Sequence, residues 1–120
     1  MTDKDIEKEI QAKGKTAVRV TPERIDSVID QEHYFTAFDG IAHAYQGVDN
    51  ALFAHKSTDT LTFCVLVLKN GFTVTGESAC ASPENFDAEI GRKIARQNAV
   101  NKIWALEGYL LKQKIHDAEK

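Results

Sequence analysis

Five polar residues in the C-terminal half of the sequence offer the best chemistry for recognising a ligand. They are Ser82, Arg92, Lys93, Arg96 and Asn98. Arginine presents a planar fork of donors that suits phosphate or carboxylate, and the asparagine amide suits the edge of a base or a ribose. Ser82 stands just before an expected helix start, where free backbone N–H groups favour anions. The pattern predicts a ligand-binding site.

The same basic residues have a simpler interpretation. On a helix, the three of them share the side that lies away from Ile90 and Ile94. A charged side of a helix is usually solvated and paired with nearby acids such as Glu89, and such exposed pairs contribute little to stability. We favour this interpretation for the cluster as a whole, and both interpretations stay open from the sequence.

No local pattern of catalytic residues is present. The histidines are His33, His43, His55 and His116, which are scattered and form no metal-binding motif;. Cys64 falls within an expected strand, where a small buried hydrophobe is the best interpretation. Cys80 falls just before a helix start, where a thiolate could be stabilised. We predict no catalytic residue, no metal and no cofactor, and a small enzyme that uses Cys80 or a histidine is an alternative.

The bulk composition is that of one globular domain. The chain has 120 residues, is 42% hydrophobic and 28% charged, and has a net charge of −3. A nucleic-acid coat protein would usually be strongly basic, so nucleic acid is a less favoured partner. The longest apolar run, residues 63–68, is too short to span a bilayer. The charged N-terminus lacks a signal-peptide pattern. We expect a cytoplasmic protein with reduced thiols and no membrane partner.

The first sixty residues are harder to assign than the rest. We expect residues 1–15 to be a flexible N-terminal arm and residues 16–120 to be a single α+β domain. Alternation suggests a short strand at residues 17–20. Thr21-Pro22 has the features of a helix start, and the helix is predicted to end near His33. Residues 34–60 are too aromatic for a solvated linker, so they are predicted to be a packed irregular segment.

Asn70-Gly71 stands between two apolar runs and is the strongest turn signal in the chain. A two-residue type I′ turn at this point sets Val67 opposite Val74. In that register the core face consists of Phe63, Val65, Val67, Phe72 and Val74. The first strand is apolar on both faces, so it is predicted to be central and to be covered twice, by this chain or by a partner. Gly76 indicates a bulge or a closely packed helix.

A long helix is predicted over residues 86–115, with a length on the order of 45 Å. A compact domain of this size has a radius of gyration near ~14 Å, so the helix would reach beyond its own core. The helix carries two apolar stripes, which need two packing partners. The sheet is one, and a symmetry-related helix is the natural candidate for the other. The predicted homo-oligomer interface consists of Ile103, Trp104, Leu106, Leu110 and Leu111.

Several stretches match, in order, a known family of phage proteins. They are Glu32–Ala37, Leu61–Cys64, Lys69–Ser78, Pro83–Asp87, Gly91–Arg96, Lys102–Trp104 and Leu106–Leu111. Together, over residues 21–115, they resemble small accessory proteins of tailed phages and prophages, with gene products of phages N4 and Sf6 as namesakes. The resemblance implies no established activity and no known site residues.

The resemblance implies a setting for the protein. A phage gene of this kind is expressed in the bacterial cytoplasm, and small accessory proteins often act by binding, commonly as symmetric oligomers. By that analogy we expect a counter-defence protein without catalytic activity, which binds a host factor or sequesters a nucleotide-type signal. The alternatives are a nucleic-acid-binding regulator that uses the basic helix face, and a small enzyme.

Overall fold

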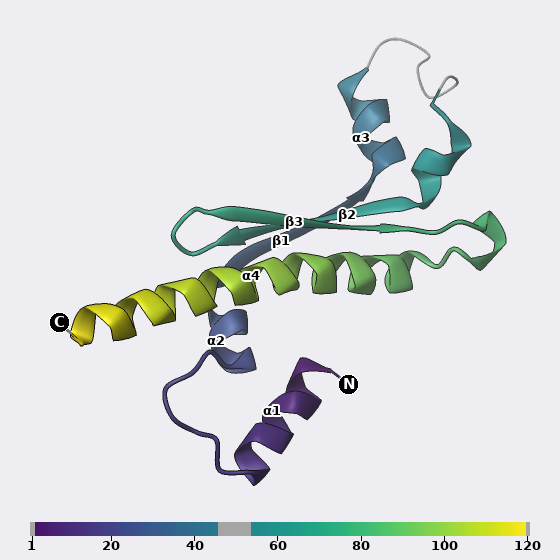
Figure 1. The fold of residues 1–120 in the computed structure, drawn as a ribbon. Coiled ribbons are helices and arrows are strands. Elements are labelled where there is room, and N and C mark those ends of the chain that lie inside the picture. The colour runs from purple at the N-terminus through teal and green to yellow at the C-terminus, as the bar shows by residue number, and fades with distance from the viewer. Residues whose placement is uncertain (1, 46–53, 120) are drawn as a thin grey trace.

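The structure is a computed structural model that describes residues 2–45 and 54–119. A three-stranded antiparallel sheet in the order β1-β2-β3 lies against one long helix (Figure 1). The predicted α+β fold, with an N-terminal helix, a sheet built around a hairpin and a long C-terminal helix, is confirmed. The elements are α1 (Asp3–Ala12), α2 (Pro22–Ser27), β1 (Ile29–Thr36), α3 (Ala37–Ala44), η2 (Lys56–Thr60), β2 (Leu61–Leu68), β3 (Thr73–Ala79), η3 (Pro83–Asn85) and α4 (Ala88–Ala118).

The N-terminal residues form a helix that is attached to the rest of the protein. The indole Nε1 of Trp104 donates a hydrogen bond to Oδ2 of Asp3 over 3.1 Å. Arg19 forms an ion pair with Glu7, the buried residue of α1. These contacts hold α1 near α2 and α4 (Figure 1). The division of the chain into an arm and a domain stays a prediction.

The helix predicted from Thr21 to His33 is much shorter, and a strand follows it. The start is as predicted, because the Thr21 side chain accepts a hydrogen bond from the N–H of Arg24 and Pro22 occupies the first turn. The helix ends at Ser27, and β1 pairs with β2 along nearly its whole length. A short helix is only marginally stable in water. The hydrogen bonds to β2 therefore determine that residues 29–36 form a strand. The strand suggested at residues 17–20 does not form.

The aromatic segment after residue 34 is more regular than predicted. It holds the end of β1, the two-turn helix α3 and the short 3-10 helix η2. A capping box begins α3: the Thr36 side chain accepts from the N–H of Asp39, and the Asp39 side chain accepts from the N–H of Thr36;. Residues 46–53 of this segment, which include Gly47 and Phe53, lie outside the described residues.

The hairpin between β2 and β3 has a three-residue turn instead of the predicted type I′ turn. The N–H of Leu68 donates to the carbonyl of Phe72, and the N–H of Gly71 donates to the carbonyl of Leu68, both over 2.8 Å. Gly71 has φ +89°, whereas Asn70 has no positive φ. This pattern fits a type I turn followed by a glycine bulge, which is the next most common hairpin closure.

The extra turn residue reverses the predicted faces of strand β2 but not those of β3. Val67 pairs with Thr73 instead of Val74, a shift of one residue. Because side chains alternate along a strand, such a shift exchanges the buried set for the opposite set. The core face of β2 therefore consists of Thr62, Cys64, Leu66 and Leu68. Of the residues expected in the core, Val74 is buried there, whereas Phe63, Val65 and Val67 are half-buried on the other face and Phe72 is exposed at the turn.

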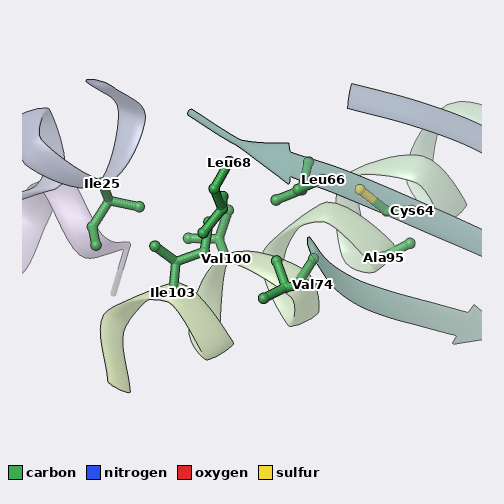
Figure 2. Packing of buried hydrophobic residues seen from close by; sticks show 9 residues of the cluster. Ile25, Cys64, Leu66, Leu68, Val74, Ala95, Val100 and Ile103 are labelled. Atoms are coloured by element: carbon green, nitrogen blue, oxygen red, sulfur yellow. The ribbon is translucent and has the colours of Figure 1, made fainter. Parts of the chain in front are cut away.

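The core lies between this face of the sheet and α4 (Figure 2). Its buried hydrophobic members are Ile25, Cys64, Leu66, Leu68, Val74, Ala95, Ala99, Val100 and Ile103. The helix approaches the sheet with small residues, and a Cβ atom on Gly76 would lie 2.2 Å from the carbonyl oxygen of Ala95. The predicted close packing of a helix at Gly76 is confirmed. Ile90 and Ile94, which share one face of α4, are exposed.

The long helix is confirmed with slightly shifted ends. It starts at Ala88, where the side chain of Asp87 accepts from the N–H of Ile90 over 3.1 Å. The start predicted at Ser82 and Pro83 begins the short η3 instead. Within the described part of the chain, no helix combines the length and the apolar character that crossing a bilayer requires.

The molecule is extended and leaves much surface uncovered. Its extents are 60 × 30 × 18 Å, and α4 covers one face of the sheet only (Figure 1). The central position predicted for β2 is confirmed. On its open face, Leu61, Phe63, Val65 and Val67 are only half-buried. The accessible surface is 8494 Å², against about 6,500 Å² for a compact protein of this mass.

Candidate functional site

Arg96, one of the predicted ligand-binding residues, joins α4 to the edge of the sheet. Its Nε donates to Oε1 of Glu32 in β1 over 2.6 Å, and Nη2 lies 3.9 Å from Asp26. The hydroxyl of Tyr34 donates to the same Glu32 oxygen over 3.0 Å. The guanidinium is therefore engaged by acids of β1 and α2, which fits the solvated, paired interpretation of this residue.

The network around Arg96 changes the acidity of its members. Partial burial acts to raise the pKa of Glu32, but the hydrogen bonds from Arg96 and Tyr34 and the charge of Arg96 outweigh burial, so that the pKa is lowered;. Burial and the hydrogen bond to Glu32 raise the pKa of the Tyr34 hydroxyl. Glu32 is thus an anion and Tyr34 a neutral donor near neutral pH, which keeps the network closed.

Three other predicted binding residues do not converge on a common site. The Nδ2 of Asn98 donates to the backbone carbonyl of Glu77 over 2.8 Å and so occupies an acceptor on strand β3. Lys93 pairs with Glu89 over 3.3 Å on the exposed surface of α4. Ser82 precedes η3 without a side-chain capping bond.

Arg92 is the predicted binding residue that stays uncommitted. Within residues 2–45 and 54–119 it has no ion pair or hydrogen bond, and its side chain is exposed. It borders a pocket of about 120 Å³ where the end of β1, the first turn of α3, the start of β2 and the start of α4 meet. We call this the Arg92 pocket, and its walls include Tyr34, Thr36, Asp39, Thr62, Phe86 and Ala88.

Thr62 is the wall residue that sequence reasoning missed. It is 3% exposed, and its Oγ1 is buried without a hydrogen-bond partner in the described part of the protein. A Cβ atom on Gly91 would lie 3.0 Å from this oxygen and 3.5 Å from the Phe86 ring, so the missing side chain of Gly91 leaves room here. The signal was a hydroxyl within an apolar strand, but the predicted register placed Thr62 on the wrong face.

A second, larger hollow lies between the hairpin and the C-terminal half of α4. It has a volume of about 810 Å³, and we call it the α4 wedge. Its walls are mainly apolar and include Leu68, Phe72, Val74, Leu106, Tyr109 and Leu110. Leu106 and Leu110, two of the predicted interface residues, are 37% and 49% exposed. The wedge therefore offers a large apolar surface that the rest of the described chain leaves open.

The other three predicted interface residues are less exposed than Leu106 and Leu110. Ile103 borders the wedge but is fully buried in the protein's own core. Trp104 lies on another side of α4, where it contacts α1 through Asp3. Leu111 is half-buried. The interface itself stays a prediction.

The thiols and histidines are not gathered into a site. Both cysteines are free, and burial raises the pKa of Cys64. The thiol of Cys80 donates to the carbonyl of Ser82 over 3.2 Å. His55 accepts from the N–H of Ser57 through Nδ1, which caps η2. Among the residues that the structure describes, no three His, Cys, Asp or Glu side chains form a group that could hold a metal ion.

Comparison with known proteins gives a family for most of the chain. The model of the "Phage protein (N4 Gp49/phage Sf6 gene 66) family" matches residues 20–115. No curated protein and no solved structure matches the chain in these comparisons. The matched stretch runs from just before α2 to the last turn of α4 and includes the sheet, the Arg92 pocket and the α4 wedge. The chain therefore belongs to the phage N4 Gp49/phage Sf6 gene 66 family.

Proposed function

We propose that the protein is a phage accessory binding protein without catalytic activity, which acts as a homo-oligomer in the cytoplasm of the bacterial host. The observation that carries this proposal is the open apolar surface of the α4 wedge. An extended apolar wall on a soluble chain usually marks an interaction site.

The dimensions of the chain support self-association. Helix α4 has 31 residues, which corresponds to about 46 Å. The strands of the sheet have at most eight residues, or about 26 Å. The helix is therefore about 20 Å longer than the strands, and Leu106 and Leu110 are exposed in the wedge that it forms with the hairpin. The accessible surface exceeds that of a compact protein by about 2,000 Å², more than the ~800 Å² that one partner buries in a standard interface.

Counter-defence is the role that fits a small phage protein that works by binding. The partner outside the oligomer would be a host factor or a nucleotide-type signal that the protein sequesters. A nucleic-acid-binding regulator is less favoured, because Arg96 and Lys93 already pair with acids. Fewer cations on α4 are then left to neutralise a phosphate backbone.

Light scattering coupled to gel filtration tests the oligomer. The wild type is expected at a mass of at least two chains of 13.4 kDa. Leu106→Glu combined with Leu110→Glu should give the single-chain mass with an unchanged far-ultraviolet circular dichroism spectrum, because two carboxylates are then placed in the wedge. Lys112→Glu, an exposed change of charge on the same helix, is the matched control and should keep the wild-type mass.

The binding function has its own measurement. A native mass spectrum of protein purified from phage-infected cells reports the oligomer together with any small molecule or host protein that stays bound. A single chain without any companion at micromolar concentration would contradict the proposal.

A further inference from the structure

We propose that the Arg92 pocket binds the phosphate group of a small nucleotide-type ligand. This inference rests on one part of the proposed function, the binding of a small signal, and names the residues and the chemical group. The pocket collects residues from the consecutive elements β1 and α3 and from β2 and α4, which lie farther along the sequence.

The charged side chain at the pocket that has no partner in the described chain is a donor. Arg92 offers a guanidinium without a partner in the described chain. Among the acceptors nearby, Oδ2 of Asp39 accepts from the N–H of Thr36 over 3.0 Å as part of the α3 capping box. The Tyr34 hydroxyl already donates its hydrogen bond to Glu32. A surplus of donors matches a ligand group that is rich in acceptors, as an oxyanion is.

The first turn of α4 adds two donors. The N–H of Ile90 is satisfied by the side chain of Asp87, and the N–H of Gly91 by its carbonyl. The N–H groups of Ala88 and Glu89 have no partner in the described chain, as expected for the first residues of a helix. Ala88 is itself part of the pocket wall. The N-terminal end of a 31-residue helix also favours negative charge;.

Thr62 provides an independent indication. A buried hydroxyl without a partner is unfavourable, and a valine of the same shape would avoid the loss. The oxygen has almost no accessible surface. The space beside Gly91, where a Cβ atom would lie 3.0 Å from this oxygen, is also bordered by the Phe86 ring. Under the proposal, the ligand group reaches the oxygen by displacing this ring. We infer that the Thr62 hydroxyl is kept for a bond to the bound ligand.

The size of the pocket limits which part of the ligand it holds. Its volume of about 120 Å³ is below the ~300–1,000 Å³ of pockets that enclose whole drug-sized molecules. A phosphate group fits inside, and the nucleoside would extend past Arg92 toward solvent. The Asp39 carboxylate in the wall limits how much negative charge the pocket accepts, so a single phosphate group is expected rather than a polyphosphate.

Calorimetry on the full chain, in a buffer free of phosphate and sulfate, tests the pocket. The probes are AMP, 3′,5′-cyclic AMP, inorganic phosphate and adenosine. We expect the two nucleotides to bind in the micromolar range, phosphate more weakly, and adenosine not at all. Phosphate that binds as tightly as the nucleotides would assign the pocket to the free ion. Adenosine that binds as tightly as AMP would overturn the proposal, and so would the absence of heat from every probe at millimolar concentration.

Two variants and a matched control assign the binding to the pocket. Arg92→Gln should weaken nucleotide binding by about 10-fold or more, because a charge-assisted hydrogen bond is lost. Lys93→Gln removes the same charge one residue away, outside the pocket, and should change binding by less than about 3-fold. Equal losses in both variants would indicate general electrostatic attraction and overturn the assignment.

Thr62→Val separates a ligand-binding role from a structural one. The variant should bind the nucleotide several-fold more weakly. Its unliganded melting temperature should rise by about 3–6 °C, since the unpaired hydroxyl is gone. A purely structural Thr62 would give unchanged binding. If the wild type is oligomeric and carries a companion that Arg92→Gln retains, the pocket assignment fails while the proposed function stands.

Discussion

A Cβ atom on Gly76 would lie 2.2 Å from the carbonyl oxygen of Ala95 and 2.4 Å from the backbone nitrogen of Ala99, so strand β3 and helix α4 meet backbone to backbone. Neither backbone can yield without moving its whole element. Gly76→Ala is therefore expected to lower the free energy of unfolding by about 3 kcal/mol or more. Urea denaturation followed by circular dichroism measures the change.

Gly108→Ala is the control for this substitution. Gly108 lies in the same helix, and a Cβ atom there would meet nothing within 4 Å. Replacing an open helical glycine by alanine should raise the free energy of unfolding by about 0.5–1 kcal/mol. If both variants change stability in the same direction, the close contact between β3 and α4 is not the reason that residue 76 must be glycine.

The second prediction concerns Glu32 and Arg96, which join β1 to α4 over 2.6 Å. The pKa of Glu32 is lowered in the folded protein from its ordinary 4.5. A lowered carboxyl pKa stabilises the fold above the unfolded-state value, and the contribution is lost as the pH falls through the folded-state value. Their side chains are 35–39% exposed, so Glu32→Gln should cost about 1 kcal/mol or less at pH 7.

The pH dependence is the diagnostic part of that experiment. The difference in unfolding free energy between wild type and Glu32→Gln should shrink as the pH is lowered from 6 to below 4.5, where Glu32 takes up a proton in the unfolded chain and then in the folded one;. A difference that stays constant over this range would show that packing, and not charge, is what the substitution removes.

The third prediction concerns the two thiols. Cys64 is fully buried beneath α4, and burial raises its pKa, whereas Cys80 is partly exposed beyond the end of β3. A thiol reagent such as 5,5′-dithiobis(2-nitrobenzoic acid) should therefore modify one thiol in the native protein and two in guanidinium. Cys80→Ser should abolish the native reaction, and Cys64→Ser should leave it unchanged. Fast labelling of Cys64 in the native protein would contradict the packing described.

The fourth prediction concerns the attachment of α1. The indole of Trp104 donates to Asp3 over 3.1 Å and is half-buried. Asp3→Ala removes the acceptor and should loosen α1, which exposes the indole and shifts its fluorescence emission to longer wavelength. Lys4→Ala, a change next to it on the same helix, is the control and should leave the emission unchanged. Identical spectra for all three proteins would mean that α1 is held without Asp3.

The elements of the C-terminal half were predictable because their signals are local. Apolar runs, a turn dipeptide and a long helical period identify β2, β3 and α4 without knowledge of the tertiary structure. The register was not predictable in the same way. Whether Asn70-Gly71 closes a two-residue or a three-residue turn depends on small differences in backbone preference. The error of one residue then reversed the assignment of every side chain in β2, whereas Val74 of β3 lies in the core as predicted.

The N-terminal half and the site show a different limit. Residues 29–36 carry weak strand signals of their own, and they form β1 because β2 offers a full ladder;. The predicted binding residues lie near one another in the sequence, but their side chains do not converge on one site in the structure. Arg96 and Asn98 turn toward partners in the sheet, and Arg92 meets Thr62 and Phe86, which come from other elements. Such groupings depend on tertiary packing and have no local signature.

The extended shape of the molecule has a consequence for how it moves in solution. With extents of 60 × 30 × 18 Å and a radius of gyration of 18.6 Å, against about 14 Å for a compact chain of this length, a single copy meets more hydrodynamic drag than a sphere of equal mass. It should elute early from a gel-filtration column calibrated with compact standards and sediment slowly for its mass. Its apparent size would then resemble that of a compact dimer, so elution volume alone would overcount its subunits.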